Sequence, residues 1–257
     1  MKKVRGMLFD LDGTLFYTLK DLAVCMNLGL REAGLYDLPV DSYREIVGGG
    51  IREMGQKAIA TELLYHRERI LAVTEADPSA WSGIFTPEVL AGALPPADHP
   101  LITAILKDFH EAYDADPIAH TYPYEGITDL LDYCVANGFK IGVVSNKDEY
   151  FTVPIVRELL PQYNWDVILG VRPGLPPKPD PAMALSAAAG WHLQPEQIAL
   201  LGDTGTDMTC ARAAGQRAWA AGWGYRPESE LRSAGAEMFF VKPTDILTYL
   251  KREEETE

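Results

Sequence analysis

The segment of residues 7–15, Met-Leu-Phe-Asp-Leu-Asp-Gly-Thr-Leu, is the feature that most constrains the fold of this chain. It begins with an apolar run, which is typical of a strand covered on both faces of a parallel sheet. Asp10 and Asp12 follow directly, and residues i and i+2 of an extended chain point the same way. We therefore expect both carboxylates at the carboxyl end of a buried strand, where open α/β sheets bind their ligands. A hard dication such as Mg²⁺, which prefers oxygen ligands, would offset the repulsion between two carboxylates so close together.

The same residues also suit an ordinary polar turn, because Asp and Gly are common where a strand ends. Gly13 would let the backbone bend sharply in either case. Other segments of the chain distinguish the two interpretations, because they carry further side chains that can bind phosphate.

A second strand-like run, residues 140–146, ends in Ser145 and Asn146. A hydroxyl and an amide can hydrogen-bond phosphate oxygens without adding negative charge. Ser and Asn are also favoured helix caps, so these two residues taken alone leave both interpretations open.

Lys178 lies among four prolines in residues 176–181, Pro-Pro-Lys-Pro-Asp-Pro. Proline stiffens the backbone, which suits a lysine whose ammonium must stay in one place. A lysine in such a loop is otherwise usually a solvated surface charge.

A further strand-like run, residues 197–202, precedes Asp203 and Asp207. Asp207 would also suit the first turn of a helix, where the helix dipole favours an acidic residue.

In this order, the four segments resemble the four motifs of the haloacid dehalogenase (HAD) superfamily in its phosphatase form. Motif I, Asp-Leu-Asp-Gly-Thr-Leu at residues 10–15, is the most specific of them. The resemblance covers essentially the whole chain, and the layout is most similar to the phosphoglycolate-phosphatase-like branch. One departure is Tyr17-Thr18, where many relatives have Asp-Ser. That pair lies outside the four motifs, so it concerns the hinge or substrate choice rather than the reaction class.

The resemblance implies a role for each motif residue. Asp10 would be the nucleophile, Asp12 the general acid and base, and Lys178 the cation that neutralises the nucleophile and the bound phosphate. Phosphate would be bound by Lys178 together with Ser145 and Asn146. The implied cofactor is Mg²⁺, held by Asp10, the backbone carbonyl of Asp12, Asp203 and, directly or through water, Asp207.

The resemblance also implies the fold class: a Rossmann-like parallel sheet flanked by helices, with an inserted all-helical cap domain. The α/β core would comprise residues 1–16 and 120–257, and the cap residues 17–119. Apolar residues do recur at helical spacing within the expected cap, in residues 19–35, 51–64 and 101–113.

Gly48, Gly49 and Gly50 precede the second of these helical patterns. They are similar to a Val-Gly-x-Gly element that lies near the substrate in this branch, although three glycines equally suit a flexible connection. The proline- and glycine-rich stretch 71–100 matches no part of the family pattern.

Composition limits the partners of the protein. A net charge of −14 argues against a nucleic acid or an anionic membrane surface as the partner. Three scattered cysteines indicate reduced thiols and a cytoplasmic location, and no apolar run reaches the ~18 residues of a membrane span. We expect a monomer or a homodimer, and a frayed, solvated tail at residues 251–257.

We therefore expect a Mg²⁺-dependent phosphatase that acts on a small phosphorylated metabolite, with 2-phosphoglycolate as the best candidate, through an aspartyl-phosphate. A sugar-phosphate mutase of the β-phosphoglucomutase type shares all four motifs and is the alternative. A dehalogenase is disfavoured, because that branch lacks an aspartate at the position of Asp12. A non-catalytic binding protein on the same fold is disfavoured by the intact set of Asp10, Asp12, Lys178 and Asp203.

Overall fold

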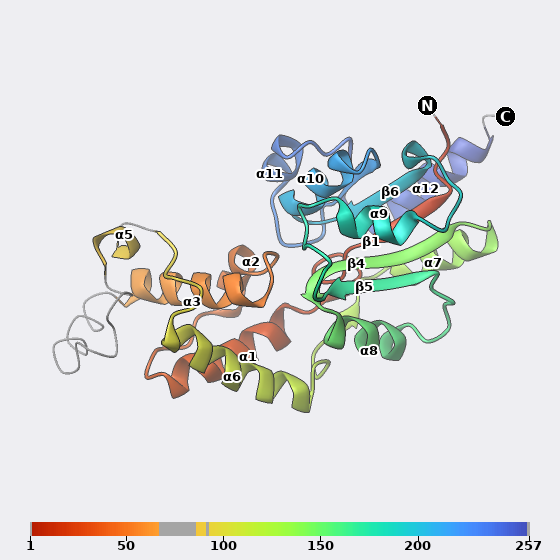
Figure 1. The fold of residues 1–257 in the computed structure, drawn as a ribbon. Helices are drawn as coiled ribbons and strands as arrows, with labels where there is room; N and C mark the ends of the chain where they lie inside the picture. The colour runs from red at the N-terminus through yellow and green to blue at the C-terminus, as the bar shows by residue number, and fades with distance from the viewer. Residues whose placement is uncertain (1, 67–85, 91–92, 256–257) are drawn as a thin grey trace. The chain divides into compact units, whose positions relative to one another are not determined.

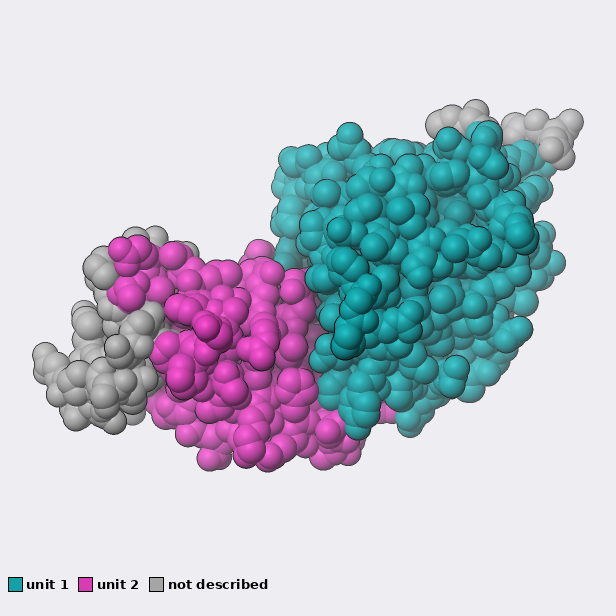
Figure 2. Space-filling view, in the orientation of Figure 1, with its two compact units in different colours: residues 1–18, 121–257 teal, residues 19–120 magenta. Residues whose placement is uncertain are grey.

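A computed structural model describes residues 2–66, 86–90 and 93–255 (Figure 1). The chain divides into two units, which Figure 2 colours separately. Unit 1 comprises residues 1–18 and 121–257, and unit 2 comprises residues 19–120. Much of the proline- and glycine-rich stretch 71–100 lies outside the described residues.

Unit 1 is built on a six-stranded sheet in which all neighbouring strands are parallel. In spatial order the strands are β5 (Val167–Val171), β4 (Lys140–Asp148), β1 (Gly6–Phe9), β6 (Ile198–Gly202), β7 (Arg217–Ala221) and β8 (Met238–Phe240). The connecting and flanking helices are α7 (Ile127–Ala136), α8 (Glu149–Leu159), α9 (Ala182–Ala188), η2 (Pro195–Gln197), α10 (Gly205–Ala213), α11 (Glu228–Ser233) and α12 (Pro243–Glu255). A short antiparallel pair, β2 (Phe16–Tyr17) and β3 (Tyr122–Pro123), completes the unit. The predicted Rossmann-like α/β fold is confirmed.

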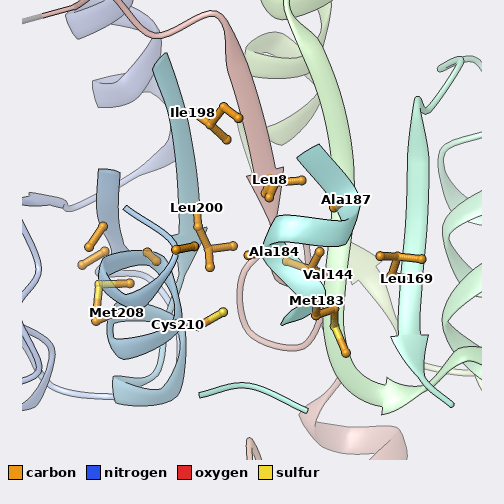
Figure 3. Packing of buried hydrophobic residues seen from close by; sticks show 14 of the residues in the cluster. Leu8, Val144, Leu169, Met183, Ala184, Ala187, Ile198, Leu200, Met208 and Cys210 are labelled. Carbon is orange, nitrogen blue, oxygen red and sulfur yellow. The ribbon is translucent and has the colours of Figure 1, made fainter. Parts of the chain in front are cut away.

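The central strands are apolar because both of their faces are covered. Every residue of β1 and β6 is buried. In Figure 3, Leu8 and Leu200 from these strands lie in one cluster with Val144 of β4 and with Met183 and Met208 of the covering helices α9 and α10. This packing fixes the directions in which the strands point and therefore where their carboxyl ends meet.

The strand order places the ligand site. The chain starts in the middle of the sheet at β1, adds β4 and β5 on one side, and then adds β6, β7 and β8 on the other. Ligands of open α/β sheets bind where the strand order reverses, at the carboxyl ends of the strands. In this sheet that position lies at the ends of β1, β4 and β6.

Every regular element described in unit 2 is a helix. These elements are α1 (Leu19–Glu32), η1 (Val40–Ser42), α2 (Tyr43–Ile46), α3 (Ile51–Tyr65), α5 (Pro87–Leu90) and α6 (Pro100–Ala115). Helices α1 and α6 pack closely, and a side chain at Gly29 of α1 would overlap the backbone carbonyl of Ile105. Ile102, Ile105 and Phe109 of α6 are buried at helical spacing, as their apolar pattern predicts.

Two elements differ from the sequence prediction. Strand β4 continues to Asp148, so Ser145 and Asn146 lie within it rather than at its end, and its pairing with β5 resumes at Asp148 after a register shift. The prediction of a frayed tail from residue 251 is wrong, because α12 continues to Glu255. Buried Leu250 anchors that helix, and Arg5 Nη1 lies 2.5 Å from Glu254 Oε1. Among the residues described, no helix is both long and apolar enough to cross a bilayer.

Candidate active site

The carboxyl edge of the sheet gathers charged side chains from separate parts of unit 1. Asp10 follows β1, Asp203 follows β6, and Asp207 lies in the first turn of α10. Lys178 comes from the loop between β5 and α9. All four side chains are buried, so residues far apart in the sequence share one water-poor site.

Lys178 joins two of the three carboxylates. Its Nζ donates hydrogen bonds to Asp10 Oδ1 at 2.6 Å, to Asp207 Oδ1 at 2.6 Å and to the carbonyl of Val144 at 2.8 Å. An ammonium has three donors, and these bonds use all of them. The interpretation of Lys178 as a solvated surface charge is therefore wrong.

Asn146 fixes the loop that carries Lys178. Its Nδ2 donates to the Lys178 carbonyl at 2.9 Å, and its Oδ1 accepts from the Lys178 backbone N–H at 2.8 Å. The neighbouring Ser145 is buried, and its hydroxyl accepts from the backbone N–H of Lys147 at 3.2 Å. The structure thus brings Asn146 next to Lys178, with its amide engaged in holding the lysine loop, and Ser145 precedes it in β4.

Asp203 is held by close backbone approach. The backbone N–H of Tyr225 donates to Asp203 Oδ2 at 2.7 Å, and the hydroxyl of Thr14 donates to Oδ1 at 3.3 Å. A side chain at Gly13 or Gly224 would overlap Asp203. Gly13 also has φ of +84°, which glycine adopts without strain, so motif I needs glycine at this position for two reasons.

Asp207 has the helix-start role that its sequence position allowed. Its Oδ2 accepts from the backbone N–H of Thr204 at 3.0 Å and from the Thr204 hydroxyl at 2.6 Å, which forms a capping box at the start of α10. Because Oδ1 accepts from Lys178, both oxygens of Asp207 have protein partners. Asp207 still belongs to the carboxylate group described next.

The carboxylates of Asp10, Asp203 and Asp207 present oxygens that all lie within 4.8 Å of one another. Burial raises the pKa of Asp10 to about 7, with Lys178 acting against this shift and Asp207 adding to it. Burial, followed by repulsion from Asp10 and Asp207, also holds the pKa of Asp203 well above its usual range. Burial opposes the charge on Lys178, but Asp10 and Asp207 outweigh it and raise the lysine pKa.

Three carboxylates are buried at this site, and the ammonium of Lys178 bonds two of them, so the group carries excess negative charge. Hard dications bind clustered carboxylate oxygens and offset such an excess. The donor set therefore fits Mg²⁺.

Asp12 faces a different cation. The chain turns after β1, and the backbone N–H groups of Leu15 and Phe16 both donate to the Leu11 carbonyl at 3.1 Å. This turn takes the carboxylate of Asp12 to Lys147, whose Nζ lies 3.2 Å from Asp12 Oδ1. Asp10 and Asp12 therefore have separate lysine partners.

Several residues of the site were missed by sequence reasoning. Lys147 directly follows the recognised Ser-Asn pair, but a lysine near a strand end is usually solvated, so nothing singled it out. The close approach of Gly224 and the capping by Thr204 depend on loop geometry that no local pattern shows. Gly48, Gly49 and Gly50 lie in unit 2 just before α3, and their contact with substrate stays a prediction.

Known proteins resemble this chain along most of its length. A family model described as haloacid dehalogenase-like hydrolase matches residues 7–221. A phosphoglycolate phosphatase from Nitrosospira multiformis is 28% identical over 86% of this chain and 85% of its own length. An N-acetylmuramic acid 6-phosphate phosphatase from Pseudomonas putida is 27% identical over 95% of both chains. A crystal structure of a candidate phosphoglycolate phosphatase from Lactobacillus delbrueckii subsp. bulgaricus is 25% identical, with a TM-score of 0.81 over 97% of this chain and 99% of its own.

Proposed function

Because the chain belongs to the haloacid dehalogenase-like hydrolase family and is a phosphatase, we propose that it hydrolyses a small-metabolite phosphomonoester in a Mg²⁺-dependent reaction. The leading candidate for the substrate is 2-phosphoglycolate, the compound named for several relatives of similar identity. The observation that carries this proposal is the buried network in which Lys178 bonds Asp10 and Asp207 beside Asp203.

The reaction we propose has two displacements at phosphorus. Asp10 attacks the phosphorus atom, the bond from phosphorus to the ester oxygen breaks, and an aspartyl-phosphate forms. Asp12 gives its proton to the leaving oxygen and then takes a proton from the water that hydrolyses the aspartyl-phosphate. Phosphate leaves, and both aspartates return to their starting states.

The surrounding residues support these displacements. Lys178 keeps Asp10 in place and places positive charge beside the transferred phosphoryl group. Ser145 is proposed to hydrogen-bond a phosphate oxygen, and Asn146 to keep Lys178 in position. When bound, Mg²⁺ would be held by Asp10, the backbone carbonyl of Asp12 and Asp203, with Asp207 alongside, and it would offset the charge of the phosphoryl oxygens.

The family resemblance extends the proposal beyond the catalytic residues. We propose that residues 17–119 serve as the cap domain and that Gly48, Gly49 and Gly50 form its substrate-facing loop. A cytoplasmic location agrees with the three cysteines, which are all buried and free.

The test is hydrolysis of an aryl phosphate with and without Mg²⁺ by the wild type and by Asp10→Asn. We expect metal-dependent turnover that falls by about 10³-fold or more in the variant. Asp129→Asn, at an exposed position on α7, is the matched control and should retain activity.

Two other results would replace the proposal. A wild type that turns nothing over but forms a trappable phosphoenzyme would favour the mutase. A wild type that forms no phosphoenzyme would favour a binding protein on the same fold.

A further inference from the structure

The loop after β7, residues 222–225, connects two parts of the candidate active site that are far apart in the sequence. Its backbone contacts Asp203 after β6, and its side chains contact the segment that follows Asp12. We propose that Tyr225 is a positioning residue for Asp203. Its hydroxyl anchors the loop, and this anchor directs the Tyr225 N–H at a carboxylate that would hold the metal. The inference rests on the proposed function.

The hydroxyl of Tyr225 is held by Thr18. The backbone N–H of Thr18 donates to the Tyr225 hydroxyl oxygen at 3.1 Å, and the Thr18 hydroxyl lies 3.1 Å from the same oxygen. Both residues are buried, so breaking these bonds would leave polar groups without water to replace them. Thr18 directly follows β2, which pairs with β3, so the hydroxyl is anchored to a paired part of unit 1.

Trp223 makes a second contact between the loop and this segment. Its Nε1 donates to the Thr14 carbonyl at 3.0 Å. The hydroxyl of the same Thr14 donates to Asp203 Oδ1 at 3.3 Å. The side chains of Trp223 and Tyr225 therefore hold the loop against the residues that follow Asp12, on either side of the contact with Asp203.

These anchors are needed because the backbone just before Tyr225 does not fix its own direction. Gly224 precedes Tyr225, and glycine adopts more backbone conformations than any other residue. Glycine is required there, since an added side chain would overlap Asp203. The Tyr225 N–H nevertheless donates to Asp203 Oδ2 at 2.7 Å, so we infer that the anchored side chains set where it points.

The orientation of Asp203 matters for metal binding. Asp203 is fully buried, and each of its oxygens accepts a hydrogen bond from the protein. A donor held at one oxygen fixes the direction of the lone pairs that remain for a cation. Removing a group that orients a metal ligand typically weakens metal binding by about 10- to 100-fold.

The test measures metal binding in the absence of substrate. Mn²⁺ is the probe, because it also binds oxygen ligands and the EPR signal of the free ion reports the bound fraction. Tyr225→Phe removes the hydroxyl and keeps the ring, whereas Thr18→Ser keeps both groups that contact this hydroxyl. Tyr163→Phe is the matched control, because it also removes a hydroxyl with two contacts. That hydroxyl lies 3.1 Å from the Thr128 carbonyl and 2.8 Å from Asp132 Oδ1, both on α7.

We expect the dissociation constant for Mn²⁺ to rise by about tenfold or more in Tyr225→Phe and to stay within about threefold of the wild type in Thr18→Ser and Tyr163→Phe. Thr18→Val removes one of the two contacts of the hydroxyl and should give an intermediate value. In hydrolysis of an aryl phosphate, Tyr225→Phe should need more Mg²⁺ for half-maximal rate, while the KM for the ester at saturating Mg²⁺ stays unchanged. Urea denaturation shows that each variant is folded under the assay conditions.

An unchanged Mn²⁺ affinity in folded Tyr225→Phe would overturn the proposal. An equal loss in Tyr163→Phe would also overturn it, because a general loosening of unit 1 would then explain the effect. Both results leave the phosphatase standing if the wild type hydrolyses an aryl phosphate with Mg²⁺. If the wild type neither binds Mn²⁺ nor hydrolyses the aryl phosphate, the proposed function itself fails.

Discussion

The two units satisfy their buried polar groups in different ways. In unit 1, Asp10, Asp203 and Asp207 lie next to one another, and Lys178 pairs with Asp10 and Asp207, so charges of the same sign accumulate. Among the described residues of unit 2, the buried side chains of Asp21, Asn27 and Glu62 each make a hydrogen bond to a backbone group. Buried carboxylates that lie together with too few cations to neutralise them indicate a functional site. Buried polar side chains that are hydrogen-bonded to the backbone indicate a structural role.

Asn27 illustrates the second pattern. Its Nδ2 donates to the Leu38 carbonyl and its Oδ1 accepts from the Leu38 N–H, both at 2.9 Å, while the Tyr43 hydroxyl donates to Oδ1 at 2.7 Å. Asp21 likewise accepts from the backbone N–H of His120 at 3.0 Å. These bonds connect the loop after α1 and the end of the unit to its helices. The Asn27 network consists of neutral groups.

The largest effect should come from Lys178→Met. It leaves Asp10 and Asp207 buried without their shared cation, so activity should fall by about 10³-fold. The free energy of unfolding, measured by urea denaturation at pH 8 without added divalent cations, should fall by about 3–5 kcal/mol. Lys242→Met, at an exposed position, should change neither quantity. If the free energy of unfolding of Lys178→Met were unchanged, the clustered carboxylates of unit 1 would not destabilise the fold. The two units would then not differ in the way described above.

Gly224→Ala tests the close packing that holds Asp203. A methyl group at Gly224 would overlap Asp203, so the carboxylate must move, and a displacement of about 1 Å at a reacting centre can cost about 10²-fold in rate. We expect such a loss in kcat with a higher Mg²⁺ concentration for half-maximal activity. At exposed Gly190 an added methyl group meets open space, so Gly190→Ala is the control. Unchanged kinetics in Gly224→Ala would show that Asp203 is free to shift.

Much of this site could be predicted because strand ends leave local signals. Asp10 and Asp203 each follow an apolar run, and a parallel sheet brings such ends together whatever their separation in sequence. Lys178 was recognisable only through its order among the other motifs, since its proline-rich loop shows stiffness but not burial.

The remaining features depend on tertiary structure. The direction of Asp12 is set by the turn at residues 11–16, which breaks the alternation that a continued strand would have kept. The extension of β4 to Asp148 depends on pairing with Val171 of β5, a partner that its own sequence does not specify. Lys147 lies in this extension, so its burial against Asp12 could not be read from the sequence.

Glu62→Gln should have the smallest effect and should act on stability alone. Glu62 is buried in α3, and its Oε1 accepts a hydrogen bond from the Tyr36 N–H at 3.0 Å. Burial raises the pKa of Glu62 from 4.5 to about 7, although the nearby His66 acts to lower it. Between these values the folded state keeps a proton that the unfolded state has released. The free energy of unfolding therefore falls as the pH rises from about 4.5 to 7 and levels off above that, by roughly 2–3 kcal/mol in total. Glutamine keeps the acceptor and removes the titration, so the variant should lose this slope in urea denaturation measured from pH 5 to 8, with kcat unchanged. Glu32→Gln, at an exposed position on α1, should keep the slope, and a Glu62→Gln protein that also keeps it would assign the titration to another group.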